Sequence, residues 1–357
     1  MTSLPPRVHQ RLQDVAHVVS AYDICLRLEK SLQLAANKGD DVGNNLIFIR
    51  ILGYLIHYAP TDQGLKTVVE EISSCIDDSA LLLFGKMYYD HYIRAFRANK
   101  GRIPTPLNYA SRPSFDTITD MINNTWVDAP QSHSDAKKNV GLALIRDGYC
   151  CVVTGRFDER SVLEIQELKE RVISDSSLRT EVTECAHIFA ESTNADIGPN
   201  TAKRNYAATM WALMHRFGYD ELPDDLNGAK VHRLENVMTL VPGFHMYFDQ
   251  LLVWFVATNE KNKYKLEATE AFLLRGYPEY VTFTTPDQAR LPVPSPTYLA
   301  IHAACAKVAH LSGAAKCIDK FYRDMDDSKT LDTDGASAAM LEHAIFELQA
   351  CGYETTV

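Results

Sequence analysis

Residues 236–249 read NVMTLVPGFHMYFD, an apolar run followed by a Pro-Gly break and a second apolar segment. The break after Val237 to Val241 and the composition of Phe244 to Leu251 indicate that a helix begins here. His245 and Asp249 are four residues apart, so on a helix their side chains share one face. This stretch therefore predicts a helix that can present an imidazole and a carboxylate to the same metal ion.

A second informative segment lies some fifty residues earlier. Thr183 to Ala190 suits a β-strand, and it contains His187. A neutral imidazole with a pKa near ~6.5 can take a proton from water at neutral pH. Further upstream, 139–147 predicts a short helix, and Tyr149 to Thr154 has the composition of another strand. His187 is thus a candidate general base.

Three motifs together resemble a known family. They are RDGYCCVVTG at 146–155, ECAHI at 184–188, and Asn236 followed by FHMYFD at 244–249. This pattern resembles the HNH endonuclease superfamily, in particular the HNH domains common in predicted fungal proteins. The resemblance covers about 139–255, less than a third of the chain.

The resemblance implies a fold, a reaction and a role for four residues. His187 would be the general base, Asn236 would orient the loop that carries it, and His245 with Asp249 would bind the metal. The reaction would be metal-dependent hydrolysis of a phosphodiester in nucleic acid, with DNA as the default substrate of the superfamily. Mg²⁺ is the first expectation, and Mn²⁺ or Zn²⁺ also suit this donor set. The expected fold class is α+β, a small ββα-metal domain between mostly helical regions.

The chain departs from the family pattern in two places. Many relatives carry a further metal ligand just before the first His, where this chain has Ala186. Glu184 and Cys185 are the candidates to replace it, and strand alternation points Cys185, but not Glu184, to the face of His187. Many relatives also bind a structural zinc through two CxxC pairs. The matching positions here hold Cys151 with Thr154 and Val241 with Phe244, so no structural zinc is expected.

The rest of the chain predicts a domain order around this centre. We expect a helical region at 1–98, a linker-like segment at 99–136, an HNH nuclease-like domain at 137–268 and a mostly helical region at 269–357. Finer expectations are a short element at 115–122, helices at 159–172, 200–217, 298–309 and 338–350, a hairpin from 252–257 and 264–266, and an acidic solvated loop at 324–334. The helix at 200–217 would be an insertion in the nuclease-like domain.

Charge and composition limit the function. A net charge of -10 argues against a protein that coats nucleic acid without specificity. A footprint would come from local basic clusters: Lys137-Lys138, Arg146, Arg156, Lys203-Arg204, and Lys230 with Arg233. The eight cysteines form no CxxC pair, and no signal peptide or membrane-spanning run is evident, so we expect an intracellular protein, nuclear or cytoplasmic, without a membrane partner. The oligomeric state stays open.

Other interpretations remain. The centre could keep the HNH fold without turnover, as a module that binds nucleic acid or protein, or it could be only the scaffold of a helical interaction protein. Taken singly, His187 could be an ordinary core or surface histidine, Asn236 a cap or turn residue, and Asp249 part of an ordinary helix turn. His215 and His232 have no assigned role.

Overall fold

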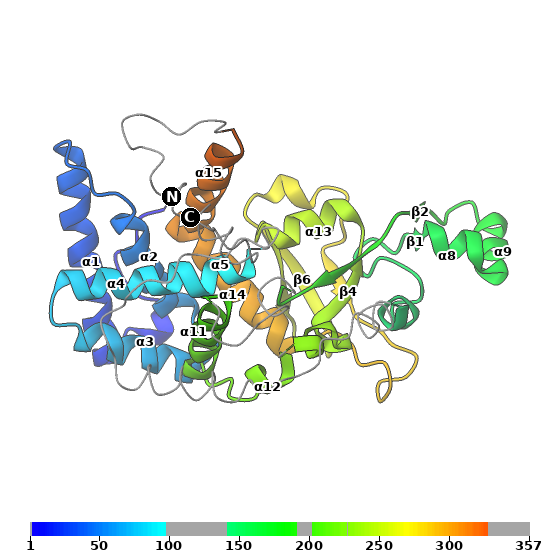
Figure 1. The fold of residues 1–357 in the computed structure, drawn as a ribbon, viewed down its shortest axis with the longest axis horizontal. Helices are drawn as coiled ribbons and strands as arrows, with labels where there is room; N and C mark the ends of the chain where they lie inside the picture. The colour runs from blue at the N-terminus through cyan, green and yellow to red at the C-terminus, as the bar shows by residue number, and fades with distance from the viewer. Residues whose placement is uncertain (1, 98–140, 191–201, 227, 328–357) are drawn as a thin grey trace, which may run out of the picture. The chain divides into compact units, whose positions relative to one another are not determined.

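The computed structural model describes residues 2–97, 141–190, 202–226 and 228–327 (Figure 1). The described residues belong to two compact units. The first contains 2–97, 202–224 and 307–327, and the second contains 141–190, 225–226 and 228–306. Helices and small sheets are both present, which confirms the expected α+β class.

The first unit is helical, as the sequence predicted for its N-terminal part. Its elements are η1 (Gln10–Leu12), α1 (Ala16–Asn37), α2 (Asn45–Tyr58), α3 (Asp62–Ser74), α4 (Asp78–Tyr88), a π-helical segment η2 (Tyr89–Ile93), α5 (Arg94–Phe96), α11 (Ala202–Arg216) and α15 (Ala314–Asp327). Side chains cap two of the starts: Thr61 accepts the N–H of Gly64 at 2.9 Å and Asp77 accepts that of Ala80 at 2.7 Å. These caps explain why α3 and α4 begin where they do.

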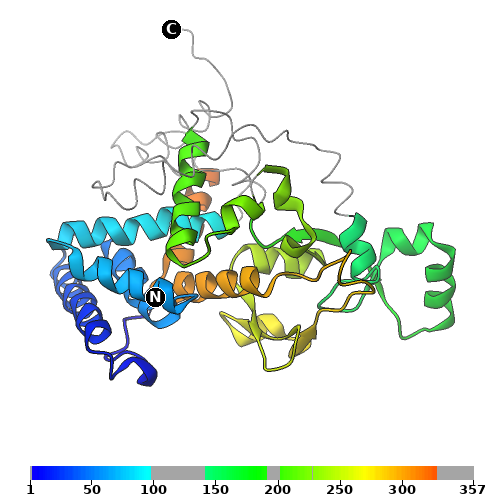
Figure 2. The same ribbon diagram turned by 90° about the horizontal axis from the view of Figure 1, so that it is seen from below.

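Helix α2 is the core of this unit. All residues from Ile47 to His57 are buried, because α1, α3 and α4 each pack against α2 (Figures 1 and 2). A helix that is apolar on every side has to be covered on every side. At Gly85 in α4, a Cβ atom would clash with the carbonyl oxygen of Phe48, so the close approach of α4 to α2 depends on that glycine.

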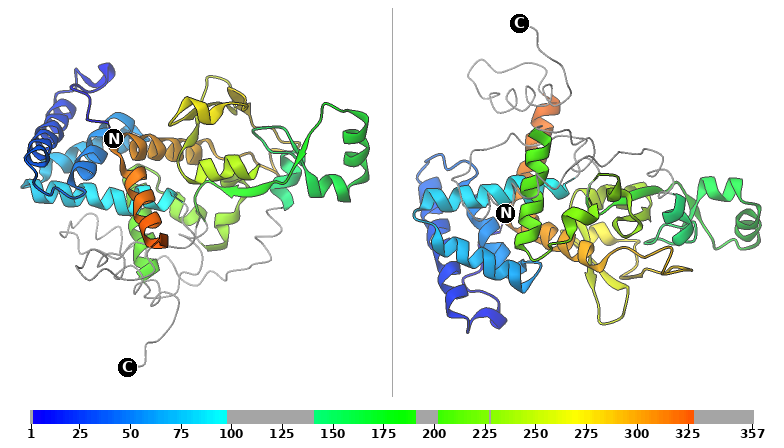
Figure 3. Two further views of the ribbon diagram at one scale, coloured as in Figure 1. Left: turned by 90° about the horizontal axis from the view of Figure 1, so that it is seen from above. Right: turned by 60° about the horizontal axis from the view of Figure 1, so that its bottom comes forward.

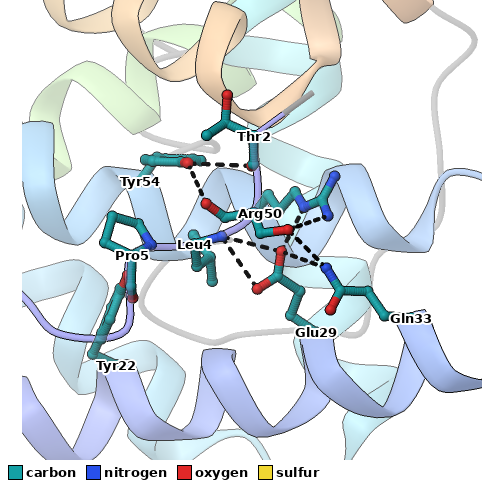
Figure 4. A network of polar contacts seen from close by, with 9 residues as sticks. Thr2, Leu4, Pro5, Tyr22, Glu29, Gln33, Arg50 and Tyr54 are labelled. Carbon is teal, nitrogen blue, oxygen red and sulfur yellow. Dashed lines mark hydrogen bonds and ion pairs between the residues drawn. The ribbon is translucent and has the colours of Figure 1, made fainter.

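The segment that precedes α1 is tied to α1 and α2 by a polar network (Figure 4). The buried carboxylate of Glu29 accepts the backbone N–H of Leu4, at 3.2 Å to each oxygen, and the Nε of Arg50 at 2.6 Å. The hydroxyl of Tyr54 donates to the carbonyl of Ser3 at 2.9 Å. A buried charge needs such partners, and here an ion pair together with a backbone donor supplies them.

The helix expected at 200–217 is α11, and it groups with the first unit. Arg216, the last residue of α11, and the following Phe217 are held there by contacts with α3, α4 and the residue that precedes α3. Phe217 stacks on Tyr88 with ring centroids 5.9 Å apart, its carbonyl accepts the hydroxyl of Thr61, and the buried Arg216 pairs with Glu71. α11 thus completes a helical core whose other members lie far away in the sequence.

The second unit contains the small sheets. Its elements are helical residues 141–146, β1 (Phe157–Asp158), α8 (Glu159–Glu164), α9 (Gln166–Ser174), β2 (Thr180–Glu181), β3 (Glu184–His187), η3 (Gly228–His232), η4 (Leu234–Asn236), β4 (Val237–Leu240), α13 (Pro242–Asp249), β5 (Val253–Ala257), β6 (Lys263–Ala268), η5 (Ala271–Leu274) and β7 (Tyr280–Thr282). Two helices have residues in both units: the short α12 (Leu222–Leu226) and the longer α14 (Pro296–Ser312). The expected hairpin is the antiparallel β5–β6 pair, and β7 extends it to three strands.

Several sequence expectations about local structure were wrong or too coarse. The strand expected at 149–154 is a turn, in which Gly148, Tyr149 and Gly155 have positive φ angles of 65°, 59° and 67°. The helix at 159–172 forms as two helices, α8 and α9. Residues 324–327 of the acidic stretch continue α15 rather than forming a loop. The elements expected at 115–122 and 338–350, and the linker at 99–136, lie outside the described residues.

Helices α8 and α9 form an arm between β1 and β2 (Figure 3). The parallel pairing of Phe157 with Thr180 closes its base. There Asp158 accepts the N–H and hydroxyl of Ser161 and the hydroxyl of Thr183, at 2.7 to 2.8 Å. α9 has no buried residue, although the guanidinium of its Arg171 lies 5.3 Å from the centre of the Phe157 ring at the base.

Candidate active site

Two short strands and a helix bring the predicted site residues into one unit. β3 pairs with β4 in antiparallel register, with His187 opposite Val237 and Glu184 opposite Leu240. α13 begins two residues after β4, and its Phe244 and Phe248 are buried at 0% and 1% exposure. Since those two rings fix one face of α13, His245 and Asp249 point to a neighbouring face that is partly open.

Asn236 is fully buried, and its side chain uses all of its hydrogen-bonding groups except one lone pair. The amide Nδ2 donates to the carbonyls of Phe189 at 3.0 Å and Val231 at 2.8 Å, and Oδ1 accepts the N–H of Phe189 at 2.9 Å. Its backbone carbonyl also accepts the N–H of Ile188 at 2.8 Å. Asn236 therefore holds the backbone directly after His187 and directly before His232.

His187 is half-buried and contacts a histidine that the sequence left without a role. Its Nε2 lies 3.0 Å from Nδ1 of His232, and the two rings meet edge to face with centroids 5.2 Å apart. Burial, then the charges of His232 and His245, lower the pKa of His187 to about 4. The ring is thus neutral at neutral pH, which is the state that a general base requires.

His245 lies between two carboxylates. Its Nδ1 is 2.7 Å from a carboxylate oxygen of Glu184, and its Nε2 is 3.4 Å from one of Asp249. Burial opposes protonation, but the contacts with the carboxylates of Asp249 and Glu184 outweigh it and raise the pKa of His245. Strand alternation placed Cys185 rather than Glu184 on the face of His187, and in the structure it is Glu184 that contacts His245. Opposite Leu240, the first residue of β3 lies next to the start of α13, whereas Cys185 packs against the apolar cluster of Ala143, Leu234 and Val237.

The four predicted residues thus meet in two subsets. Asn236 is bonded to the backbone that carries His187, and His245 is paired with Asp249. Within the described residues, no hydrogen bond or ion pair joins His187 to His245, although the charge of His245 contributes to the lowered pKa of His187. Ala186 is fully buried and offers no donor between the subsets.

The donors beside α13 fit a cation held by few protein ligands. Two ligands that each lie ~2.1 Å from one ion are at most about 4.2 Å apart, so the separation of 3.4 Å between Nε2 of His245 and Asp249 is within reach of one ion. In the part of the chain that the structure describes, no group of three or more His, Cys, Asp or Glu side chains is arranged to hold a metal. The remaining positions around an ion would then fall to water and substrate, as is common for Mg²⁺.

The turn that replaces the expected strand has its own internal bonds. Sγ of the buried Cys151 accepts the N–H of Thr154 at 3.4 Å, and the N–H of Val152 donates to the carbonyl of Thr239 in β4 at 2.9 Å. Val241 and Phe244, the second pair of positions compared with the zinc ligands of relatives, are buried apolar side chains. The turn and β4 are therefore joined by backbone bonds and apolar packing.

Several of the basic side chains expected to contact nucleic acid are buried or paired with carboxylates. Arg146 is 1% exposed, and Arg233 pairs with Asp225 and Glu235. Arg156 is exposed and pairs with Glu181, and Lys230 is exposed. The side chains of the other two clusters, at 137–138 and 203–204, lie outside the described residues.

A histidine on a short strand, a buried asparagine before its antiparallel partner, and a histidine with an aspartate on the following helix together define a domain of the ββα type. Residues 151–256 match the family model HNH_2, described as HNH endonuclease, and the match includes all four of these residues. The chain therefore contains an HNH-family domain, as the motifs predicted. Comparisons with curated proteins and with solved structures gave no match. No helix of the described residues is long and apolar enough to cross a membrane.

Proposed function

We propose that this protein is a metal-dependent endonuclease of the HNH type that hydrolyses phosphodiester bonds in nucleic acid, with DNA as the substrate to test first. The observation that carries the proposal is the bonding of Asn236. One buried carboxamide fixes the backbone after His187, at Phe189, and the backbone before His232, at Val231. A general base has to be held within a fraction of an ångström, and this is the role that the family pattern gives to the asparagine.

His187 is the base in this proposal, and the contact with His232 determines which nitrogen acts. If Nδ1 of His232 donated the proton, Nε2 of His187 would be occupied and its Nδ1 would carry the ring proton, so neither nitrogen could accept one. The base therefore requires the opposite arrangement, in which Nε2–H of His187 donates to Nδ1 of His232 at 3.0 Å. Nδ1 of His187 then has a free lone pair that takes the proton from the attacking water.

His245 and Asp249 are the proposed metal ligands, through Nε2 and the carboxylate that lies 3.4 Å away. A divalent cation supplies positive charge that stabilises the phosphate and the leaving oxygen. Mg²⁺ or Mn²⁺ suits a site with few protein ligands, and a mixed imidazole and carboxylate pair also admits Zn²⁺. Asp249 contributes the negative charge that attracts the cation to this face of α13.

Cleavage of a supercoiled plasmid tests the function. Wild type should nick or linearise the plasmid with Mg²⁺ or Mn²⁺ and lose this activity in excess chelator. His187→Ala should be inactive, whereas His215→Ala should cut like wild type, because His215 lies on α11 and pairs with Asp220. Equal cutting by His187→Ala would contradict the proposal. So would the absence of any cutting of DNA or RNA by wild type with Mg²⁺, Mn²⁺ or Zn²⁺.

A second candidate is an HNH-fold module that binds nucleic acid without cutting it. The absence of a ligand at the buried Ala186, together with the lack of a three-residue metal cluster among the described residues, favours it. A wild-type protein that binds DNA but gives no calorimetric signal with metal and no cleavage would support this candidate over the enzyme.

A further inference from the structure

We infer that Glu184 is a positioning residue, which holds the ring of His245 so that Nε2 and Asp249 together face a metal ion. The inference rests on the proposed nuclease function and deepens its metal site. It assigns a role to Glu184, three positions before His187, in a chain that has Ala186 where many relatives carry a further ligand.

The two contacts of His245 differ in length, and the difference separates their roles. The 2.7 Å between Nδ1 and Glu184 is the length of a hydrogen bond from an imidazole N–H to a carboxylate. The 3.4 Å between Nε2 and Asp249 is longer than a good hydrogen bond and leaves these two atoms as neighbouring ligands of one ion. One ring nitrogen is therefore hydrogen-bonded to Glu184, and the other faces the carboxylate of Asp249.

The chemistry of the partners fixes the position of the ring proton. An ionised carboxylate only accepts hydrogen bonds, so the contact with Glu184 requires the proton on Nδ1. In the neutral ring this leaves the lone pair on Nε2, beside Asp249. A carboxylate that accepts from the far nitrogen of a metal-binding histidine orients the ring, selects its tautomer and makes the ligand more basic.

The backbone holds Glu184 in place for this role. Its register partner is Leu240, two residues before α13 begins. The preceding Thr183 donates its hydroxyl to Asp158 at 2.7 Å, which ties the start of β3 to the base of the α8–α9 arm. On the other side, Phe248 stacks on the buried His302 with centroids 3.8 Å apart, so α13 is fixed as well. The hydrogen bond from His245 to Glu184 thus joins two anchored elements.

A direct metal ligand and a positioning residue respond differently when a carboxylate side chain is replaced by an amide. The side chain of Glu184 is 48% exposed, so its replacement has little effect on folding. In Glu184→Gln the amide oxygen still accepts Nδ1–H, although a neutral hydrogen bond is about half as strong as a charged one. Glu184→Ala removes the acceptor. If Glu184 were itself a ligand, the loss of its charge in the glutamine variant would cost nearly as much as its removal.

Calorimetric titration of MnCl2 into the metal-free full chain tests the inference. Wild type should bind, His245→Ala and Asp249→Ala should lose binding, Glu184→Ala should weaken it about 10- to 100-fold, and Glu184→Gln should stay within about threefold of wild type. Glu181→Ala is the matched control, because it removes a nearby carboxylate that pairs with Arg156 instead of His245. Thermal unfolding of each variant checks that it is folded.

The outcomes separate this inference from the proposed function. Equal affinity of wild type and Glu184→Ala would overturn the positioning role and leave the metal site intact. A glutamine variant as weak as the alanine variant would make Glu184 a direct ligand and also overturn it. Wild type that binds no Mn²⁺ would overturn the proposed metal site and the inference with it.

Discussion

The side chain of Asn236 and the backbone of Phe189 form a pair of hydrogen bonds in opposite directions. Oδ1 accepts the N–H of Phe189 at 2.9 Å, and Nδ2 donates to its carbonyl at 3.0 Å. The residue before β4 is thereby joined to the residue two positions after His187 in a fully buried setting. Only a side chain with both a donor and an acceptor in one plane can make this pair, so asparagine at 236 is determined by geometry.

Replacing Asn236 should therefore cost stability as well as activity. Asn236→Ala removes three buried hydrogen bonds to the backbone, and Asn236→Asp keeps an acceptor but removes both donated bonds and buries a charge. We expect each to lower the free energy of unfolding by about 2 to 4 kcal/mol and to abolish plasmid cleavage. Urea unfolding measures the first effect. Asn259→Ala, in the exposed turn between β5 and β6, should match wild type, and an Asn236→Asp protein as stable as wild type would contradict the argument.

The role of His232 can be tested by the acceptor that it supplies. His232→Leu removes the group that accepts from Nε2 of His187, so the ring can turn or change tautomer, and we expect cleavage to slow about tenfold or more. In His232→Asn, Oδ1 can take the place of Nδ1 and should restore most of the rate. Single-turnover cleavage at saturating DNA measures the step itself. A leucine variant as fast as wild type would show that His187 does not depend on His232.

The elements that the sequence predicted correctly around the site have strong local signals. Pro242-Gly243 marks the start of α13, and the alternation of β5 and β6 marks their hairpin. The spacing of Asn236 and His245 and the motif around His187 identified the HNH-family domain that the family model confirms for 151–256. These features depend on residues close together in the chain, which is why they can be read from sequence.

What the sequence did not predict depends on pairing between distant residues. The segment 149–154 is rich in strand-forming residues, yet Cys151 bonds back to Arg156 and Val152 to Thr239, and these contacts bend it into a turn. Glu184 reaches His245 because the register places it opposite Leu240, and alternation along a four-residue strand contains no such information. His232 lies 45 residues after His187, and the bonds of Asn236 to Phe189 and Val231 hold the two segments side by side.

Arg146 illustrates the same limit and gives a further prediction. The sequence suggested a basic contact for nucleic acid, but all five N–H donors of this buried guanidinium are used within the second unit. Nε and Nη2 bind the two oxygens of Asp147, at 2.7 and 2.9 Å, and the remaining donors reach the carbonyls of Leu234, Val237 and Pro292 at 2.6, 2.9 and 3.1 Å. Two of these carbonyls flank Asn236.

Lysine cannot replace the planar guanidinium of Arg146, since its three N–H donors radiate from one nitrogen atom. Arg146→Lys should lower the free energy of unfolding by about 3 kcal/mol or more, because it removes hydrogen bonds to buried carbonyls and leaves Asp147 with a poorer partner. Arg156→Lys, at an exposed ion pair, should change it by less than about 0.5 kcal/mol. Urea unfolding of both variants makes the comparison, and similar values for the two would contradict the structural role of Arg146.

The last prediction concerns acid stability and the buried His57 of α2. Burial, then the charge of His9, lower the pKa of His57 to about 4, and its buried Nε2 has no hydrogen-bond partner in the described residues. Protonation therefore favours the unfolded chain, whose histidine has a pKa near ~6.5. The contribution of the neutral His57 to the free energy of unfolding is complete above pH ~6.5 and is lost as the pH falls towards 4. The loss amounts to about 3 kcal/mol at most for this one group. In His57→Phe the new ring lies among the rings of His9 and Tyr22, and the urea midpoint should fall less between pH 6.5 and 4 than in wild type. His17→Phe, at an exposed site of α1, should follow wild type. A smaller pH dependence should remain in the His57 variant, because the pKa values of His187 and His302 are also lowered, to about 4 and about 3. A urea midpoint that falls with pH as in wild type would show that His57 is protonated equally in the folded and unfolded states.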